Sequence, residues 1–231
     1  GIRVAFDNTD NSPGWKFNEW EMKGVPLRIE LGPRDIEAGK MLCARRDTFE
    51  KVEMPLDNAV ESIKDLLDIL ASYKINIFHF HFNDDEAWRI EIPSLPELTS
   101  YGSRKGMTHD EKDFLMQTYA GNGNPDDLST SANGYITSEQ FVELIKYAHN
   151  RGIEIIPEIE TPGHSRAVIL SMKNRYNKYI KTDRKKAEEF VVWDTEDTTA
   201  YTSVQGYSDN VLNLALPGTY RFVKRIIDEL E

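Results

Sequence analysis

The sequence has 231 residues, 39% of them hydrophobic, which is enough to build one large domain or two small ones. It holds 28 Lys and Arg against 39 Asp and Glu, a formal net charge of −11, which disfavours general binding to a polyphosphate backbone. The single cysteine, Cys43, excludes an internal disulfide, and no apolar run is long enough to span a membrane. No basic-then-apolar leader follows Gly1, and because a mature secreted protein would lack one too, the compartment stays unknown.

The first part of the chain, up to about Met54, shows short strand patterns separated by turn residues. The runs 27–31 and 40–44 favour strands, and Gly and Pro turns such as Ser12-Pro13-Gly14 flank them. This part predicts a small mixed sheet. A helix is predicted next, over residues 58–73, because apolar residues recur there at spacings of three and four and an Asn-x-x-Glu capping pair opens it.

The later part alternates predicted strands and helices. A strand is expected over 75–82, with histidines on one face and phenylalanines on the other, flanked by bulk on both faces and therefore buried. Thr137 and Gln140 predict a capping box for a second helix, which Gly152 closes, and a strand over 153–159 follows. Thr219 is expected to cap a last helix. This alternation predicts a parallel sheet with crossover helices.

Two polar segments interrupt this alternation. Residues 121–134 are rich in Gly, Asn, Asp, Ser and Pro and predict an irregular loop. Residues 183–210 are too many for a bare connector, so we expect this segment to fold over a site.

Ionisable residues follow both predicted strands of the later part. The first strand leads into Asn83-Asp84-Asp85-Glu86, and the second into Glu158, Glu160 and His164. In parallel α/β units, functional groups gather at the carboxyl ends of strands, and carboxylates beside an imidazole suit acid–base chemistry on a polar substrate. The alternative is that these residues are solvated loop charges and helix caps.

Two further features each allow two interpretations. The pair His79 and His81 lies on one strand face, an arrangement that binds zinc in some barrel hydrolases, but histidines at this spacing are more often hydrogen-bonded core residues. We therefore expect no metal. Trp88 either stacks on a sugar ring or belongs to the core.

The segment 74–92, with the core sequence His79-Phe80-His81-Phe82-Asn83-Asp84-Asp85-Glu86, resembles the second strand and loop of family 20 glycoside hydrolases. The stretches 93–98 and 101–104 and the run Pro157-Glu158-Ile159-Glu160-Thr161-Pro162-Gly163-His164 resemble the same family in the same order. The resemblance covers about 66–231. It implies part of a (β/α)8 TIM barrel, preceded by the small mixed-sheet α/β fragment, and a substrate-assisted β-N-acetylhexosaminidase without a cofactor, acting on β-linked N-acetylhexosamine sugars.

The resemblance also implies roles for individual residues. Asp84 and His164 match the family's supporting relay for the general acid, with Glu160 nearby. In the same loop, Asp85, Trp88 and Arg89 are the expected substrate contacts. The family's acetamido-orienting Asp and general-acid Glu stand in a His-x-Gly-Gly-Asp-Glu motif that does not occur in these 231 residues, so we expect the chain to be inactive.

The N-terminal part has a different resemblance. The stretch from Ser12 to Asp35, continuing through residues 44–48, is similar to the anticodon-binding domain of prolyl-tRNA synthetases, although no class II synthetase catalytic motif is present. In that family the positions of Phe17, Glu21 and Arg28 contact anticodon bases. The resemblance implies tRNA as a partner, bound weakly at most.

The sequence thus predicts a chimera: a synthetase-like fragment over 1–58 and a partial barrel over 59–231, joined within the helix 58–73. Three functional hypotheses remain open. The chain is an enzyme of the hexosaminidase class, an RNA-binding fragment, or an engineered chimera without activity that forms a homo-oligomer to cover its strand edges.

Overall fold

In the computed structural model, residues 27–30, 40–45, 51–55, 59–118, 121–197 and 201–231 are described. They fall into two compact units, the first within residues 1–79, 129–131 and 143–156, and the second within 80–128, 132–142 and 157–231. The elements occur in the order β1 (Leu27–Glu30), β2 (Lys40–Arg45), β3 (Lys51–Pro55), α3 (Ala59–Ser72), β4 (Ile77–His81), β5 (Asn83–Asp84), β6 (Ala87–Trp88), α4 (Glu97–Ser100), β7 (Lys105–Gly106), β8 (Leu115–Met116), α5 (Ser138–His149), β9 (Glu154–Glu158), α6 (Arg166–Tyr179), α7 (Arg184–Glu188) and α8 (Pro217–Leu230).

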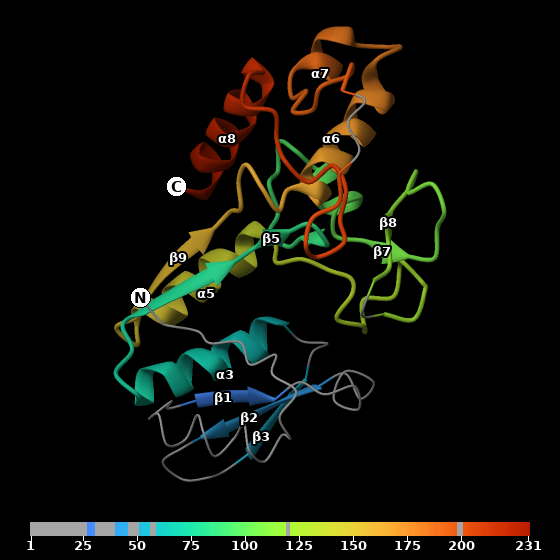
Figure 1. Ribbon diagram of the computed structural model, residues 1–231. Helices are drawn as coiled ribbons and strands as arrows, with labels where there is room; N and C mark the ends of the chain where they lie inside the picture. Colours follow the sequence, from blue (N-terminus) through green and yellow to red (C-terminus); the bar gives the residue numbers. More distant parts are fainter. Residues whose placement is uncertain (1–26, 31–39, 46–50, 56–58, 119–120, 198–200) are drawn as a thin grey trace. The chain divides into compact units, whose positions relative to one another are not determined.

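Strands β1, β2 and β3 form one sheet in chain order. Leu27 pairs with Arg45 and Met41 with Met54, and both pairings are antiparallel (Figure 1). The strands predicted near 27–31 and 40–44 are confirmed. Strand β3 was not predicted from the sequence. The sequence predicted a mixed sheet, which contains parallel and antiparallel pairs. Among the described strands β1, β2 and β3, both pairings are antiparallel.

The helix predicted over 58–73 is confirmed as α3. Its side chains Leu67 and Leu70 are buried, as the apolar spacing requires. The capping residue Asn58 lies outside the described residues.

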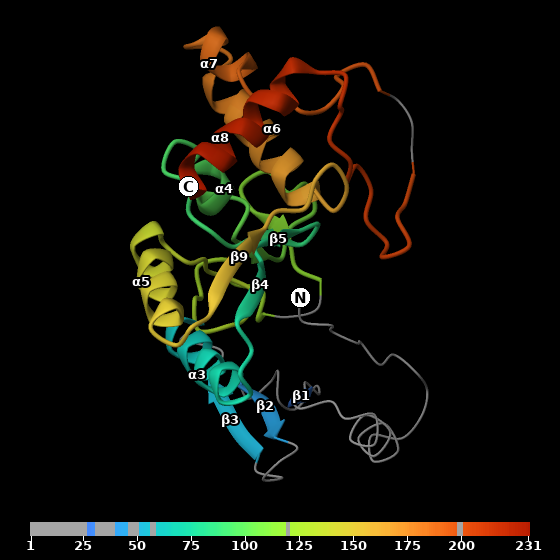
Figure 2. The same ribbon diagram turned by 90° about the vertical axis from the view of Figure 1, so that its left-hand side faces the viewer.

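Strands β4 and β9 pair with each other and run parallel. The Glu154 amide donates to the Asn76 carbonyl at the start of both strands, and the Phe82 amide donates to the Glu158 carbonyl at their end. Figures 1 and 2 show the two arrows side by side with the same direction. The parallel arrangement brings the carboxyl ends of both strands to one edge, as the sequence predicted.

The prediction that the first of these strands is buried on both faces was wrong. His79 and His81 are exposed, whereas Phe82 is fully buried and packs edge-on against Phe141 at 5.2 Å between ring centres. The alternation of faces is therefore confirmed. The two histidines lie on the exposed face of the strand, and Phe82 lies on the buried face.

Helix α5 begins with the predicted capping box. The Gln140 amide donates to Thr137 Oγ1 at 3.2 Å, and the Thr137 amide donates to Gln140 Oε1 at 2.9 Å. The buried residues Leu144 and Ala148 lie on its apolar face. Sequence and structure agree on this helix.

Helix α8 begins two residues before its predicted cap. Pro217 occupies the first turn, where its missing N–H costs no hydrogen bond, and Thr219 instead donates its hydroxyl to the Asn213 carbonyl at 2.6 Å. The prediction that Thr219 caps the helix was wrong. A Cβ added at Gly218 would lie 2.1 Å from the Val191 carbonyl oxygen, so backbone approaches backbone directly there.

Helices α6 and α7 were not predicted from the sequence. They lie next to each other in both views of the ribbon (Figures 1 and 2). The inner face of α6 carries Arg175, which donates from Nη1 to Glu97 Oε2 of α4 at 3.0 Å, with both side chains buried. Because a charged residue occupies a buried position of α6, the spacing of apolar residues alone does not reveal this helix.

The loop predicted over 121–134 is confirmed as irregular chain. It is held by its own polar groups, since Asn133 donates to the Asn124 and Asp127 carbonyls. None of the described helices is both long and apolar enough to cross a bilayer.

Candidate active site

The carboxyl ends of β4 and β9 bring Asp84 and His164 together. His164 Nδ1 lies 3.0 Å from Asp84 Oδ1, and both side chains are partly exposed, His164 at 40% and Asp84 at 49%. Residues 80 positions apart in the chain thus form a carboxylate–imidazole pair. Such a pair fixes the imidazole tautomer and leaves Nε2 for a proton transfer partner.

His164 is held in an unusual backbone conformation. Its φ of 50° lies in the left-handed region, which residues other than glycine seldom occupy. The hydrogen bond to Asp84 raises the pKa of His164 above its ordinary value, although partial burial lowers it. The negative charges of Asp84, Asp85 and Glu160 also raise this pKa. The imidazolium form is therefore favoured at this rim.

Glu160 is fixed through its backbone by Asn83. The Glu160 amide donates to Asn83 Oδ1 at 2.8 Å, and Asn83 Nδ2 donates back to the Glu160 carbonyl at 3.3 Å. Asn83 is buried and was not singled out from the sequence. Its position directly after the strand predicted over 75–82 was the available signal, but its partner is 77 residues away.

Asp85 is 1% exposed, and both of its carboxylate oxygens accept hydrogen bonds from the protein. Its Oδ1 accepts from the Arg166 amide at 3.1 Å, at the first turn of α6, and its Oδ2 accepts from Asn210 Nδ2 at 2.8 Å. The same Oδ2 lies 3.9 Å from His164 Nδ1. Asp85 therefore lies behind the Asp84–His164 pair. Both of its oxygens are already bound within the protein in this arrangement, so neither is free to bind a sugar.

Part of the segment predicted to fold over a site reaches these residues. Tyr207 donates its hydroxyl to Glu86 Oε1 at 2.9 Å, and Lys105, whose side chain is 2% exposed, donates to Glu86 Oε2 at 2.6 Å. Burial raises the pKa of Glu86, but the hydrogen bond and charge of Lys105, together with Tyr207, outweigh it and hold that pKa below its ordinary value.

Trp88 is a core residue. It is fully buried, its Nε1 donates to the Ile90 carbonyl, and its ring lies 6.3 Å from that of Phe222 in an edge-on arrangement. A ring without an exposed face cannot stack on a sugar. Of the two interpretations, the structure supports the core.

Arg89 is used within the fold. Its guanidinium donates to three carbonyls, those of Ser103, Ala132 and Gly134, at 2.7–3.2 Å. Burial lowers the pKa of Arg89 to about 10, so it stays protonated at neutral pH. Its contacts fasten the loop 121–134 to β6, and all three acceptors belong to the protein.

Two groups of side chains have possible metal ligand atoms within 4.8 Å of one another. They are His81, Glu158 and Glu160, and Asp84, Asp85 and His164. The predicted pair of His79 and His81 does not itself form such a group. Acidic groups gather at a protein surface without an ion often enough that proximity alone does not indicate a metal.

The predicted RNA contacts cannot be placed. Phe17 and Glu21 lie outside the described residues, and of Arg28 the structure describes the backbone, in β1.

Comparison with known proteins gives a different result for each part of the chain. Residues 58–231 match the model of the glycosyl hydrolase family 20 catalytic domain. The chain belongs to glycosyl hydrolase family 20. A second model, the anticodon binding domain, matches residues 1–66. This family 20 chain is therefore a chimera, and its two matched ranges overlap within 58–66.

The relatives support both parts. A β-hexosaminidase of Vibrio vulnificus is 42% identical over 166 residues, covering 71% of this chain and 19% of that protein. A proline–tRNA ligase of Symbiobacterium thermophilum is 42% identical over 123 residues, covering 52% of this chain and 24% of that protein. The chain thus spans about a fifth to a quarter of the length of these relatives.

The fold comparison agrees with the family 20 assignment. The crystal structure of an exo-β-N-acetylglucosaminidase of Vibrio harveyi in complex with N-acetylglucosamine has a TM-score of 0.59 and 39% identity, covering 75% of this chain and 23% of that chain. Within residues 58–231, the described part of this chain is accordingly part of an α/β barrel.

Proposed function

We propose that residues 58–231 supply the acid–base relay of a β-N-acetylhexosaminidase site, and that the 231 residues assayed alone do not hydrolyse glycosides. The 3.0 Å contact between His164 Nδ1 and Asp84 Oδ1 carries the first part of this proposal. It lies at the carboxyl ends of two parallel strands, where barrel enzymes place their chemistry. The similarity to exoglycosidases supports a β-linked N-acetylhexosamine as the sugar.

In this proposal the relay has a defined chemical task. Asp84 Oδ1 binds one ring nitrogen of His164. In a complete family 20 site, the other ring nitrogen faces the carboxyl group that protonates the leaving oxygen. Glu160 and the buried Asp85 add negative charge that stabilises the imidazolium. Neither Asp84 nor His164 is the proton donor to the glycosidic oxygen.

The 231 residues contain no His-x-Gly-Gly-Asp-Glu motif, which in this family holds the residue that orients the acetamido group and the residue that donates the proton. Without both groups, the attack on the anomeric carbon lacks charge stabilisation and the leaving oxygen lacks its acid.

A chromogenic N-acetylglucosaminide tests this directly. The purified 231-residue chain should give no turnover above buffer, with an Asp84→Ala variant from the same host as the control for contaminating enzyme. Turnover that scales with protein concentration and disappears in the Asp84→Ala variant would contradict the proposed inactivity.

A second function, weak tRNA binding, is favoured by the anticodon-binding match over residues 1–66. The Phe17, Glu21 and Arg28 positions offer an aromatic ring, a carboxylate and a guanidinium, which stack on bases and pair with base edges. The same 66 residues hold 10 Lys and Arg against 13 Asp and Glu, so their charge opposes the phosphates.

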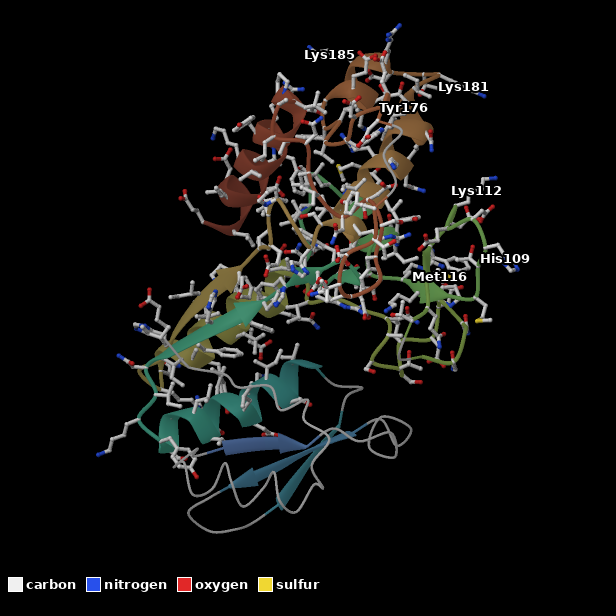
Figure 3. All side chains as sticks on the ribbon, in the orientation of Figure 1. His109, Lys112, Met116, Tyr176, Lys181 and Lys185 are labelled. Atoms are coloured by element: carbon white, nitrogen blue, oxygen red, sulfur yellow. The ribbon has the colours of Figure 1, made fainter. Side chains whose placement is uncertain are left out.

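Binding of proline tRNA should therefore be weak and fall steeply as salt rises. Exposed lysines elsewhere provide the matched control, since Lys181 and Lys185 project outward from the region of α6 and α7 (Figure 3). Specific binding is lost in Arg28→Ala and kept in Lys181→Ala/Lys185→Ala, whereas loss in the second variant alone indicates non-specific attraction. Tight binding that persists at physiological salt would contradict the expected weakness.

A further inference from the structure

Asn210, the last residue of the segment 183–210, links this segment to the residues around the Asp84–His164 pair. It is 6% exposed, and all its side-chain and backbone polar groups have partners. Its Nδ2 donates to Asp85 Oδ2 at 2.8 Å, and its Oδ1 lies 2.9 Å from the Tyr201 hydroxyl, which donates to it. Its backbone amide donates to that same hydroxyl at 2.7 Å, and its carbonyl accepts from the Ser165 amide at 3.0 Å.

Two of these bonds join Asn210 to groups that position His164, namely the Ser165 amide and the Asp85 carboxylate. The Ser165 amide follows directly after the left-handed backbone of His164, so the bond to the Asn210 carbonyl fixes the end of that turn. Asp85 Oδ2 lies 3.9 Å from His164 Nδ1, so the bond from Asn210 Nδ2 fixes the carboxylate behind the imidazole. One residue thus holds both the backbone and the electrostatic surroundings of the histidine.

We propose that Asn210 is a positioning residue that sets the orientation of His164 against Asp84, with Tyr201 holding Asn210 in place. An amide is suited to this task, because it donates to a carboxylate and accepts from a hydroxyl at the same time without adding charge. Aspartate at this position would face Asp85 with a second carboxylate. The inference rests on the proposed relay, and Asn210 acts through Asp85 and the 161–165 turn, not on a sugar.

The test follows His164 by NMR in the full 231-residue chain, by titrating the imidazole and measuring exchange of the Ser165 amide. In Asn210→Ala, the His164 pKa should fall toward its ordinary value. The carbonyl of residue 210 remains in this variant, but it is no longer held by the side-chain bonds to Asp85 and Tyr201. The bond that it accepts from the Ser165 amide should therefore open more often, and this amide should exchange about five- to tenfold faster, the factor that corresponds to one hydrogen bond of ordinary strength. Tyr201→Phe, at a partly exposed ring, should shift both in the same direction by less.

Asn213→Ala is the matched control. Asn213 lies in the chain that follows Asn210, but its Oδ1 accepts only the nearby Ala215 amide at 2.9 Å. It should leave both readouts unchanged. A purely structural role for Asn210 would lower stability and speed exchange throughout the second unit, including the amides of α8, without changing the His164 pKa of the folded protein.

The outcomes separate this inference from the proposed relay. An ordinary His164 pKa in the unmodified chain contradicts the relay. The positioning role of Asn210 is then tested by amide exchange alone: faster exchange at Ser165 but not in α8 of Asn210→Ala supports it, and equal acceleration at both overturns it. A raised pKa that stays unchanged in folded Asn210→Ala and Tyr201→Phe overturns the positioning role and leaves the relay intact. If Asn210→Ala does not fold, Tyr201→Phe decides by the same two readouts.

Discussion

At the residue scale, the polar side chains after β4 and β9 are of two kinds. Some are partly exposed at the carboxyl ends of the strands, and others have all their hydrogen-bond partners within the protein. Asp84 and His164 are partly open, whereas Asp85 and Arg89 have every contact supplied by the protein. The sequence predicted that these residues gather, because strand ends of a parallel sheet share an edge. It could not separate the two groups, because the partners of Asp85 come from positions 166 and 210.

Replacing Asp84 with Asn should lower the His164 pKa, since the carboxylate hydrogen bond is the largest contribution that raises it. Because the folded-state pKa is raised, the stabilisation from this pair is complete below the unfolded histidine pKa of about 6.5 and is lost as pH rises through the folded value. Urea unfolding at a series of pH values should show a difference between the two proteins that is largest at acidic pH. A difference that grows with rising pH would contradict the assigned charge state.

At the element scale, local signals predicted α5 well and α6 not at all. The capping box of α5 is complete within four consecutive residues, Thr137 to Gln140, so the sequence contains the whole interaction. Helix α6 buries Ser171 and Arg175 beside its apolar residues, and the partner that makes Arg175 tolerable in the core is Glu97, 78 positions earlier. Its buried face has no simple apolar period.

Thr137→Ala should lower the free energy of unfolding by about 1 kcal/mol, the usual cost of losing an N-cap side chain. Thr182→Ala is the matched control, because that hydroxyl is exposed and makes a longer bond of 3.3 Å to the Tyr179 carbonyl. Equilibrium urea unfolding measures both. Adding Gln140→Ala to Thr137→Ala should cost less than the sum of the single changes, since the two side chains form one reciprocal unit. Equal costs for Thr137→Ala and Thr182→Ala would remove the capping assignment.

At the scale of the whole molecule, the described barrel strands form only a small sheet. Among the described residues, β4 and β9 make a sheet of two strands. A closed barrel pairs eight strands in a ring. Recognising two families in the sequence indicated a partial barrel. The exposure of His79 and His81 could not be predicted, because it depends on which elements pack over that face of β4, and the strand itself carries no signal for this.

We expect the chain to form dimers or higher oligomers, because a two-stranded piece of a barrel sheet is a template for strand pairing between copies. Multi-angle light scattering across a concentration series should show a mass above 26.6 kDa that rises with concentration. A monomer at every concentration would reject self-association and favour cover from within the same chain. A substitution on the solvent side of α8, such as Tyr220→Lys, is the control that should not affect edge pairing.

The close approach of Gly218 to Val191 also limits how this helix can vary. Tyr220, which is 64% exposed on α8, can be exchanged for many residues without affecting this contact. Position 218 admits no side chain, because even a methyl group would overlap the Val191 carbonyl. Glycine is a poor helix former, costing about 1 kcal/mol relative to alanine, yet here it is the residue that lets the helix dock. Variation among natural relatives should therefore be widest on the outer face of α8 and narrowest at a position that has no side chain at all.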